Sequence, residues 1–237
     1  MTEQKVPTDA PTPRKRPLQE RGVVRYNKLL DAAHALLQSH ELDEIGLYQI
    51  AKAAQVPPAS AYHFFPTSGA VLLALAERYH AQFASVGQRV DTPGVTTWQG
   101  MLKLSLDEAV RIYNENLPIC KLFLGSHTTR ELVQSESGFN ELIAGRMLAF
   151  YDQFFHMPRI RDAQGKFLIM LTLVDAVWSL SFTKHRRITP QLAEEALSVA
   201  IAYCRTFLPE VLELREAGGP RGDVEDAAAS AASGPSR

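Results

Sequence analysis

The histidine, cysteine and carboxylate residues of this sequence are not spaced as a catalytic or metal site requires. Its seven histidines are scattered along 237 residues, and it contains neither an HExxH motif nor a glycine-rich phosphate loop. One ExxH motif joins Glu77 to His80, but a di-metal site in a helical bundle would need a second such motif on another helix. We therefore expect no enzyme activity, no metal and no cofactor, and we expect Glu77 and His80 to lie on a solvated helix face.

Basic side chains gather near the N-terminus, although the net charge of the chain is −1. Residues 1–30 contain seven Lys and Arg against three Asp and Glu, a local charge of +4, and six of the seven cations lie between Arg14 and Lys28. A basic arm beside a folded domain suits contacts with phosphates or with a minor groove. Alone the signal is weak, because most charge runs contact only solvent.

Apolar residues recur every three or four positions through most of the chain, which is the spacing of one face of a helix. The first 86 residues do not alternate over a useful length with the period of two that indicates a strand. The stretch Asp91–Thr97 contains Pro and Gly and interrupts the helical pattern. We predict an all-α protein, with four helices before this stretch and further helices after it. The predicted helices cover approximately residues 21–39, 47–54, 58–65, 71–83, 98–113, 119–124, 139–155, 163–184 and 190–208.

The apolar segments indicate a soluble protein. The N-terminal residues have no apolar core of the kind found in a secretory signal. The longest apolar stretch, Phe167–Phe182, is shorter than the roughly 20 residues that cross a bilayer, and Asp175 lies near its centre. Cys120 and Cys204 have no metal-ligand neighbours, so we expect both to be buried as small apolar residues. These features predict a cytoplasmic protein with no membrane contact.

The helix predicted over residues 163–184 is apolar all round rather than on one face. Such a helix must be covered on both sides. The following helix, predicted over 190–208, has a matching apolar surface. We therefore predict a homodimer through these last two helices, with burial of the first of them inside a single chain as the alternative.

Residues 45–75 carry the richest local signal. Two short helical patterns, Leu47–Ala54 and Pro58–Phe65, are separated by about three residues, which is the geometry of a helix-turn-helix. Val56 is placed to fill the turn. Pro58 suits the first turn of a helix, because its missing N–H is not needed there.

This segment resembles the TetR family of one-component bacterial regulators. The family pattern combines an Ile-Ala pair, an Ala-x-Val turn, a Tyr-x-x-Phe recognition helix and a further helix with Leu near its start. The sequence meets this pattern at Ile50-Ala51, Ala54-Gln55-Val56, Tyr62-His63-Phe64-Phe65 and Val71-Leu72. The resemblance implies a three-helix helix-turn-helix domain that a fourth helix joins to a C-terminal helical domain for ligand binding and dimerisation.

Three departures from the family pattern concern the DNA contact. Gln55 stands where the family usually has Gly, and a left-handed backbone there costs a non-glycine residue about 1 kcal/mol. Ser68 and Gly69 stand where Lys and Glu are common. The recognition helix has no Arg or Lys, so it cannot read guanine through a bidentate Arg. We expect the basic arm and phosphate contacts to supply affinity, and small groups and DNA shape to supply sequence choice.

By this resemblance, the exposed face of the recognition helix contacts a double-stranded, pseudo-palindromic operator. Tyr62 and His63 would bond to phosphates, residues 58–60 would approach bases, and Tyr48 would reach the backbone or a base edge. Core packing is the alternative for Tyr62, and exposure to solvent alone is the alternative for His63. The predicted DNA-binding residues are Arg21, Arg25, Tyr48, Lys52, Pro58, Ala59, Ser60, Tyr62 and His63.

For the second domain, the resemblance implies a ligand that shifts the fourth helix, so that the two recognition helices no longer match successive major grooves. The candidates are aromatic and Met residues with polar anchors, which suggests an apolar or aromatic effector; core packing is the alternative for most of them. Asp175 is costly in an apolar helix unless it is partnered, and a structural role competes with ligand anchoring. The predicted ligand-binding residues are Trp98, Met101, Tyr113, His127, Met147, Tyr151, Asp175 and Trp178.

These observations predict a transcriptional repressor that a small-molecule effector releases from its operator. We assign a flexible basic arm to residues 1–20, the helix-turn-helix domain to 21–86, the ligand-binding and dimerisation domain to 95–213 and a disordered tail to 217–237. Two other classes compete with this hypothesis. An all-helical enzyme lacks the constellation described above, and a dimeric helical small-molecule-binding protein with weakened or lost DNA binding is permitted by the uncharged recognition helix.

Overall fold

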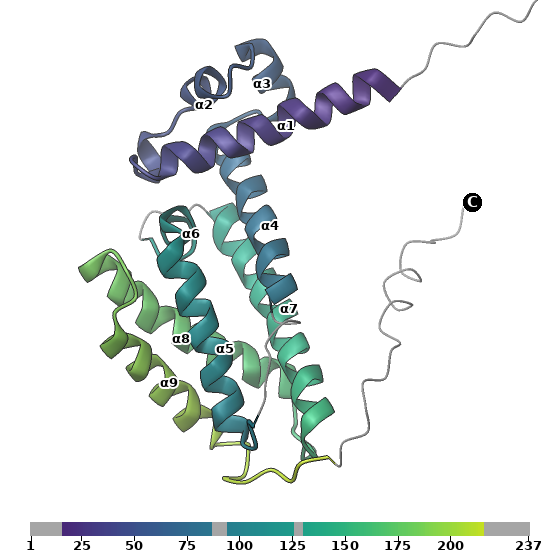
Figure 1. Ribbon diagram of the computed structural model, residues 1–237, viewed down its shortest axis with the longest axis vertical. Coiled ribbons are helices and arrows are strands. Elements are labelled where there is room, and N and C mark those ends of the chain that lie inside the picture. The colour runs from purple at the N-terminus through teal and green to yellow at the C-terminus, as the bar shows by residue number, and fades with distance from the viewer. Residues whose placement is uncertain (1–15, 87–93, 126–129, 216–237) are drawn as a thin grey trace, which may run out of the picture.

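The computed structural model describes residues 16–86, 94–125 and 130–215, and the regular structure in these ranges is helical, apart from one isolated bridge between Phe155 and Leu214. The predicted all-α fold is thus confirmed. The helices are α1 (Arg16–Leu37), η1 (Leu42–Glu44), α2 (Leu47–Ala53), α3 (Pro58–Phe64), α4 (Ser68–Val86), α5 (Trp98–Glu115), α6 (Leu117–Phe123), α7 (Arg130–Phe154), α8 (Ala163–His185) and α9 (Pro190–Cys204). In Figure 1, α1 to α3 form the upper end, α4 descends from them, and α5 to α9 pack below.

The first core lies between α1, α2, α3 and α4. Leu29, Ala33 and Leu37 of α1 recur every four residues and are fully buried there, together with Ile50 of α2 and Leu75 of α4. Residues 20–28 of α1 include no fully buried side chain. The helix begins at Arg16 rather than near residue 21, since a helix end that buries little gives only a weak apolar pattern.

Two polar contacts fix α4 to α1. His34 Nδ1 and the Tyr79 hydroxyl are hydrogen-bonded at 2.6 Å, and Arg78 Nη1 donates to Asp31 Oδ1 at 2.6 Å. Burial is the larger influence on His34 and lowers the pKa of its imidazole, with the charge of Arg78 acting in the same direction. The middle of α4 is therefore joined firmly to α1.

The second core lies among α5, α7, α8 and α9, and its largest fully buried side chains are aromatic. α7 begins at Arg130, nine residues before the apolar pattern starts at Phe139. α9 ends at Cys204, four residues before the predicted end, because Thr206 and Phe207 donate to the carbonyls three residues earlier and form tight turns. Cys120 and Cys204 are both buried, as predicted.

The short helix α6 belongs to both cores. Ile119, Leu122 and Phe123 pack in the first core, whereas Cys120 and Leu124 pack in the second. Every residue from 118 to 124 is buried. α6 therefore joins the domain that carries the helix-turn-helix to the helical domain below it.

The long helix α8 is only partly covered within one chain. Its buried residues include Phe167, Trp178 and Phe182, but Ile169 and Leu180 are exposed. By length and composition alone α8 could cross a membrane. It nevertheless packs along α7 and α9, and one side of it remains open.

Candidate DNA-binding surface and effector site

The turn between α2 and α3 is held by a Schellman motif. The backbone N–H of Val56 donates to the Ala51 carbonyl at 3.0 Å, and that of Gln55 donates to the Lys52 carbonyl at 3.2 Å. Gln55 has φ +54°, so the left-handed conformation expected at this position is present without glycine. Val56 is buried and fills the turn, as its apolar character predicted.

Two tyrosines stand out from this scaffold. Tyr48, in the first turn of α2, is 63% exposed, and Tyr62 on α3 is 56% exposed. Ala61 and Phe65 supply the buried contacts of the same segment instead. Tyr62 is therefore free to contact a ligand outside the protein, and core packing, the alternative for this residue, does not apply.

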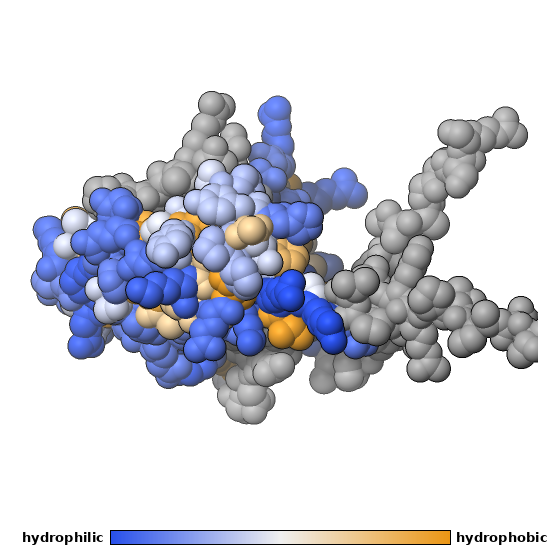
Figure 2. Space-filling model, turned by 90° about the horizontal axis from the view of Figure 1, so that it is seen from above, coloured by the Kyte–Doolittle hydropathy of each residue, from blue (hydrophilic) through white to orange (hydrophobic). Residues whose placement is uncertain are grey.

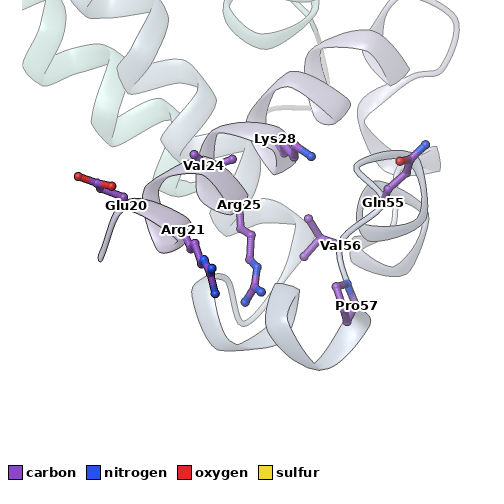
Figure 3. A pocket seen from close by; sticks show the side chains of 8 residues that line it. All are labelled: Glu20, Arg21, Val24, Arg25, Lys28, Gln55, Val56 and Pro57. Atoms are coloured by element: carbon purple, nitrogen blue, oxygen red, sulfur yellow. The ribbon is translucent and has the colours of Figure 1, made fainter. Parts of the chain in front are cut away.

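A groove of about 630 Å³ runs between α1 and the α2–α3 turn (Figure 3). Arg21, Arg25 and Lys28 follow one another on α1 at spacings of four and three, and all three line the groove; the acidic residue in it is Glu20. Figure 3 shows Arg21 and Arg25 extending in the same direction, toward the level of Pro57. The groove brings cations beside α3, which contains no Lys or Arg.

The predicted DNA-binding residues all belong to α1, α2 or α3, and none is buried. Lys52, Pro58, Ala59 and His63 are exposed, and Ser60 is half-buried. Seen from above, this end of the molecule is largely hydrophilic with smaller apolar areas between (Figure 2). The sequence indicated these residues individually, but the groove that groups the α1 cations with Gln55 and Pro57 depends on the packing of α1 against the turn.

Several predicted ligand-binding residues are parts of the second core. Trp98, Met101 and Tyr151 are almost completely buried. Trp98 Nε1 donates to the Pro209 carbonyl at 2.9 Å, and the Tyr151 hydroxyl donates to the Trp98 carbonyl at 3.3 Å. Met147 packs half-buried against the same core. For these residues the geometry favours core packing over ligand contact, while His127 lies outside the described residues.

Tyr113 and Trp178 are brought together with residues that the sequence did not single out as ligand contacts. A chain of ring contacts runs from Trp178 to Tyr113 (5.5 Å between centroids), Tyr113 to Phe83 (5.4 Å), Phe83 to Phe139 (6.3 Å) and Phe139 to His80 (3.9 Å). We call these five residues, from α4, α5, α7 and α8, the aromatic cluster. The four helices that supply its members are separated in sequence, so only the common aromatic character of these residues could have connected them.

His80 is not on a solvated face, contrary to expectation. Its ring is stacked on Phe139 and on Phe123, 4.8 Å away, and its Nε2 atom is buried with no hydrogen-bond partner. Burial lowers the pKa of His80 to about 4. Glu77 is exposed, as expected. Across the described ranges, no three His, Cys, Asp or Glu residues are grouped so that they could hold a metal ion.

Asp175 lies one helical turn before Trp178 on α8. The Asn140 side-chain amide donates to Asp175 Oδ2 at 2.9 Å. Burial raises the pKa of Asp175 to about 6, although the hydrogen bond from Asn140 opposes this rise. The carboxylate is thus bonded to a neutral amide, and no Lys, Arg or His of the described chain forms an ion pair with it.

A polar contact joins the small domain to α6 and to the end of α8. The buried Lys121 Nζ donates to the His40 carbonyl at 2.8 Å and lies 3.4 Å from Glu41 Oε1. Arg186 Nη2 is 2.5 Å from the same Glu41 oxygen. Lys121 and Glu41 thereby connect α6 with the segment that leads into α2.

Comparisons with known proteins agree with this geometry. Residues 29–75 match the family model of bacterial regulatory proteins, tetR family. No curated protein matches the sequence. A TetR-family transcriptional regulator from Streptomyces coelicolor is 24% identical, with a TM-score of 0.62 over 78% of this chain and 99% of that chain.

A second similar structure is SmeT, the repressor of the Stenotrophomonas maltophilia multidrug efflux pump SmeDEF. It is 18% identical, with a TM-score of 0.56 over 84% of this chain and 95% of that chain. A complex of SmeT with triclosan is 17% identical, with a TM-score of 0.54 over 84% and 99%. At these identities the likeness establishes a shared fold.

Proposed function

We propose that this chain, which belongs to the tetR family of bacterial regulatory proteins through its helix-turn-helix domain, is a cytoplasmic, homodimeric repressor that a small molecule releases from DNA. The observation that carries the proposal is the surface formed by α1, α2 and α3. It combines an uncharged, exposed reading face with a cation-lined groove directly beside it.

The side chains of this surface divide into those that contact phosphates and those that contact bases, and their chemistry decides which. Arg21, Arg25 and Lys28 supply charge for phosphates, which fixes the position of the protein on a duplex but reads no sequence. Ser60 and the Pro58–Ala59 pair present hydroxyl and apolar groups to base edges, and the exposed Tyr62 presents its hydroxyl to a phosphate. Sequence choice then depends on few direct contacts and on the shape of the operator.

The open face of α8 supports a homodimer. Ile169 and Leu180 are large apolar residues left exposed on a helix that runs beside α9. A second copy would cover these residues and would place two α3 helices on one duplex, which calls for a pseudo-palindromic operator. Release by an effector is proposed by analogy with SmeT, which is a repressor and whose complex contains triclosan.

The test is DNA binding to the region upstream of the protein's own gene, measured over a series of salt concentrations. The triple variant R21A/R25A/K28A should bind more weakly, and the slope of log K against log salt should fall by up to about 3, since each lost phosphate contact contributes about 0.9. The matched control changes three exposed cations remote from the groove, R159A/R161A/K184A. An equal effect of both triple variants would mean that the groove is not the phosphate-binding surface. No specific binding by the unmodified protein would favour a small-molecule-binding protein that has lost DNA binding.

A further inference from the structure

We infer that the aromatic cluster receives a lipophilic organic cation, for which Asp175 is the counter-charge. This inference rests on the proposed function, because it gives the chemical class of the effector. It follows from three properties of the site: an uncompensated carboxylate, a buried N–H with no partner, and a continuous set of aromatic rings reaching α4.

Among the acidic side chains that the structure describes, Asp175 combines burial with the lack of a Lys or Arg partner. Asp31, Asp107 and Asp152 each pair with a Lys or Arg at 2.9 Å or less and are well exposed. Asp175 is half-buried, and its hydrogen bond comes from the neutral Asn140. A carboxylate withdrawn from water is stabilised by an opposite charge. The described residues provide none, so a bound cation would complete this site.

The second property is the unmatched donor of Trp178. Its side chain is 3% exposed, and Nε1 has no hydrogen-bond partner. Buried polar atoms are nearly always bonded in folded proteins, and an exception calls for a ligand or an ordered water. Trp178 lies three residues after Asp175 on α8, so the two share a side of the helix. A ligand here can place a positive charge beside the Asp175 carboxylate. An acceptor atom of the ligand, or a water ordered beside it, can accept a hydrogen bond from Trp178 Nε1.

The rings select the kind of cation. Tyr113, Phe83 and Phe139 adjoin Trp178 in an unbroken series of ring contacts. Aromatic faces attract organic cations within about 6 Å of the ring centre, and Trp does so most strongly. A small, strongly hydrated ion would gain little from such surroundings, whereas an aryl-substituted or alkyl-substituted ammonium or phosphonium ion would bury its apolar groups against them.

The cluster also reaches the helix that carries the DNA-binding domain. His80 and Phe83 are both on α4, which is tied to α1 by Tyr79 and Arg78. A ligand inserted among the rings has to displace Phe83 or Phe139 from their present contact. Its binding energy would therefore favour a different position of α4, as a switch between two arrangements requires.

The experiment compares two ions of the same shape and opposite charge, tetraphenylphosphonium and tetraphenylborate, on the full-length protein. Binding is followed by calorimetry and by tryptophan fluorescence. Tetraphenylphosphonium should bind, and tetraphenylborate should bind at least about tenfold more weakly. The isosteric variant D175N should lose about tenfold or more of the phosphonium affinity. The control D107N removes an exposed carboxylate and should bind phosphonium as the unmodified protein does.

Equal affinity for the two ions, no binding of either, or full phosphonium affinity in D175N would overturn the inference. A thermal melt of D175N shows whether it folds, and W178F offers a second variant at the site that keeps the carboxylate. DNA binding is measured separately without either ion. If the unmodified protein binds its upstream DNA but not phosphonium, the inference fails and the proposed function stands. If it binds phosphonium but not DNA, the cation site stands and the proposed function fails.

Discussion

The small N-terminal domain and the helical domain below it differ in whether their buried polar atoms have hydrogen-bond partners. In the small domain the core is apolar and the charged side chains lie outside it, and no buried side-chain polar atom of residues 20–67 lacks a partner. In the second domain and along α4, the interior itself contains unmatched groups, such as His80 Nε2 and Trp178 Nε1. The proposed DNA-binding surface thus rests on a scaffold whose buried polar groups are bonded, whereas the interior that we propose as the ligand site contains polar groups that a ligand can bond.

The first half of this contrast is tested most sharply by truncating two aromatic side chains of the same segment, one in the core and one on the surface. Phe65→Ala should lower the free energy of unfolding by about 3–5 kcal/mol, since it empties a filled core position. Tyr62→Ala should change stability by less than about 0.5 kcal/mol, because Tyr62 is exposed. Denaturant unfolding gives both values, and a gel shift should find that Tyr62→Ala has lost DNA affinity. Comparable destabilisation by the two changes would place Tyr62 in the scaffold.

The contact between the domains should be next in size. Lys121→Ala removes a buried ammonium group from the His40 carbonyl and from Glu41, and we expect a loss of about 2–3 kcal/mol in unfolding free energy. Arg186→Ala removes an exposed partner of the same carboxylate and should cost about 1 kcal/mol or less. Calorimetric melts of the two variants check this order. If Arg186→Ala proved the more damaging, the buried lysine would not be the main link.

His80 offers a test of the second half of the contrast through pH. Its folded-state pKa of about 4 lies below the ordinary value of 6.5, so between these values the unfolded chain takes up the proton and the folded chain resists it. The stability that neutral His80 supplies is complete above pH 6.5 and is lost as pH falls toward 4. Between pH 7 and 5 the unmodified protein should lose about 1–2 kcal/mol more than His80→Phe, which retains a ring between Phe123 and Phe139. Parallel pH profiles for the two proteins would mean that the imidazole is hydrated.

The smallest expected effect concerns the helix-turn-helix scaffold. Gln55→Gly should raise the unfolding free energy by about 1 kcal/mol, because glycine adopts φ +54° without the strain of a side chain. Ala53→Gly, at the last residue of α2, should instead lower it by up to about 1 kcal/mol. The melting temperatures of the two variants should therefore shift in opposite directions from that of the unmodified protein. A lower melting temperature for Gln55→Gly would mean that the glutamine side chain stabilises the turn.

The sequence predicted the small domain well and the second domain unevenly, for a physical reason. α2 and α3 end within one residue of their predicted limits, because turn chemistry and apolar spacing are both local. The start of α7 was predicted nine residues late, since residues 130–138 contain too few apolar positions to give a helical pattern.

The candidate sites divide in the same way. Every predicted DNA-contacting residue lies on three consecutive helices and avoids the core. In the second domain Tyr113, Asp175 and Trp178 were predicted as ligand contacts, but His80, Phe83, Phe139 and Asn140 were not. These four enter the site only when α4 and α7 pack beside α5 and α8, and no local pattern carries that information.

The double membership of α6 limits how this protein can be taken apart and recombined. A chimera of this fold would join the small N-terminal domain of one protein to the helical domain of another. A junction between α4 and α5 would separate Ile119, Leu122 and Phe123 from the first core, which they help to fill. A successful chimera should therefore keep the side of α6 that faces the small-domain core together with that domain, even though α6 follows α5 in the sequence.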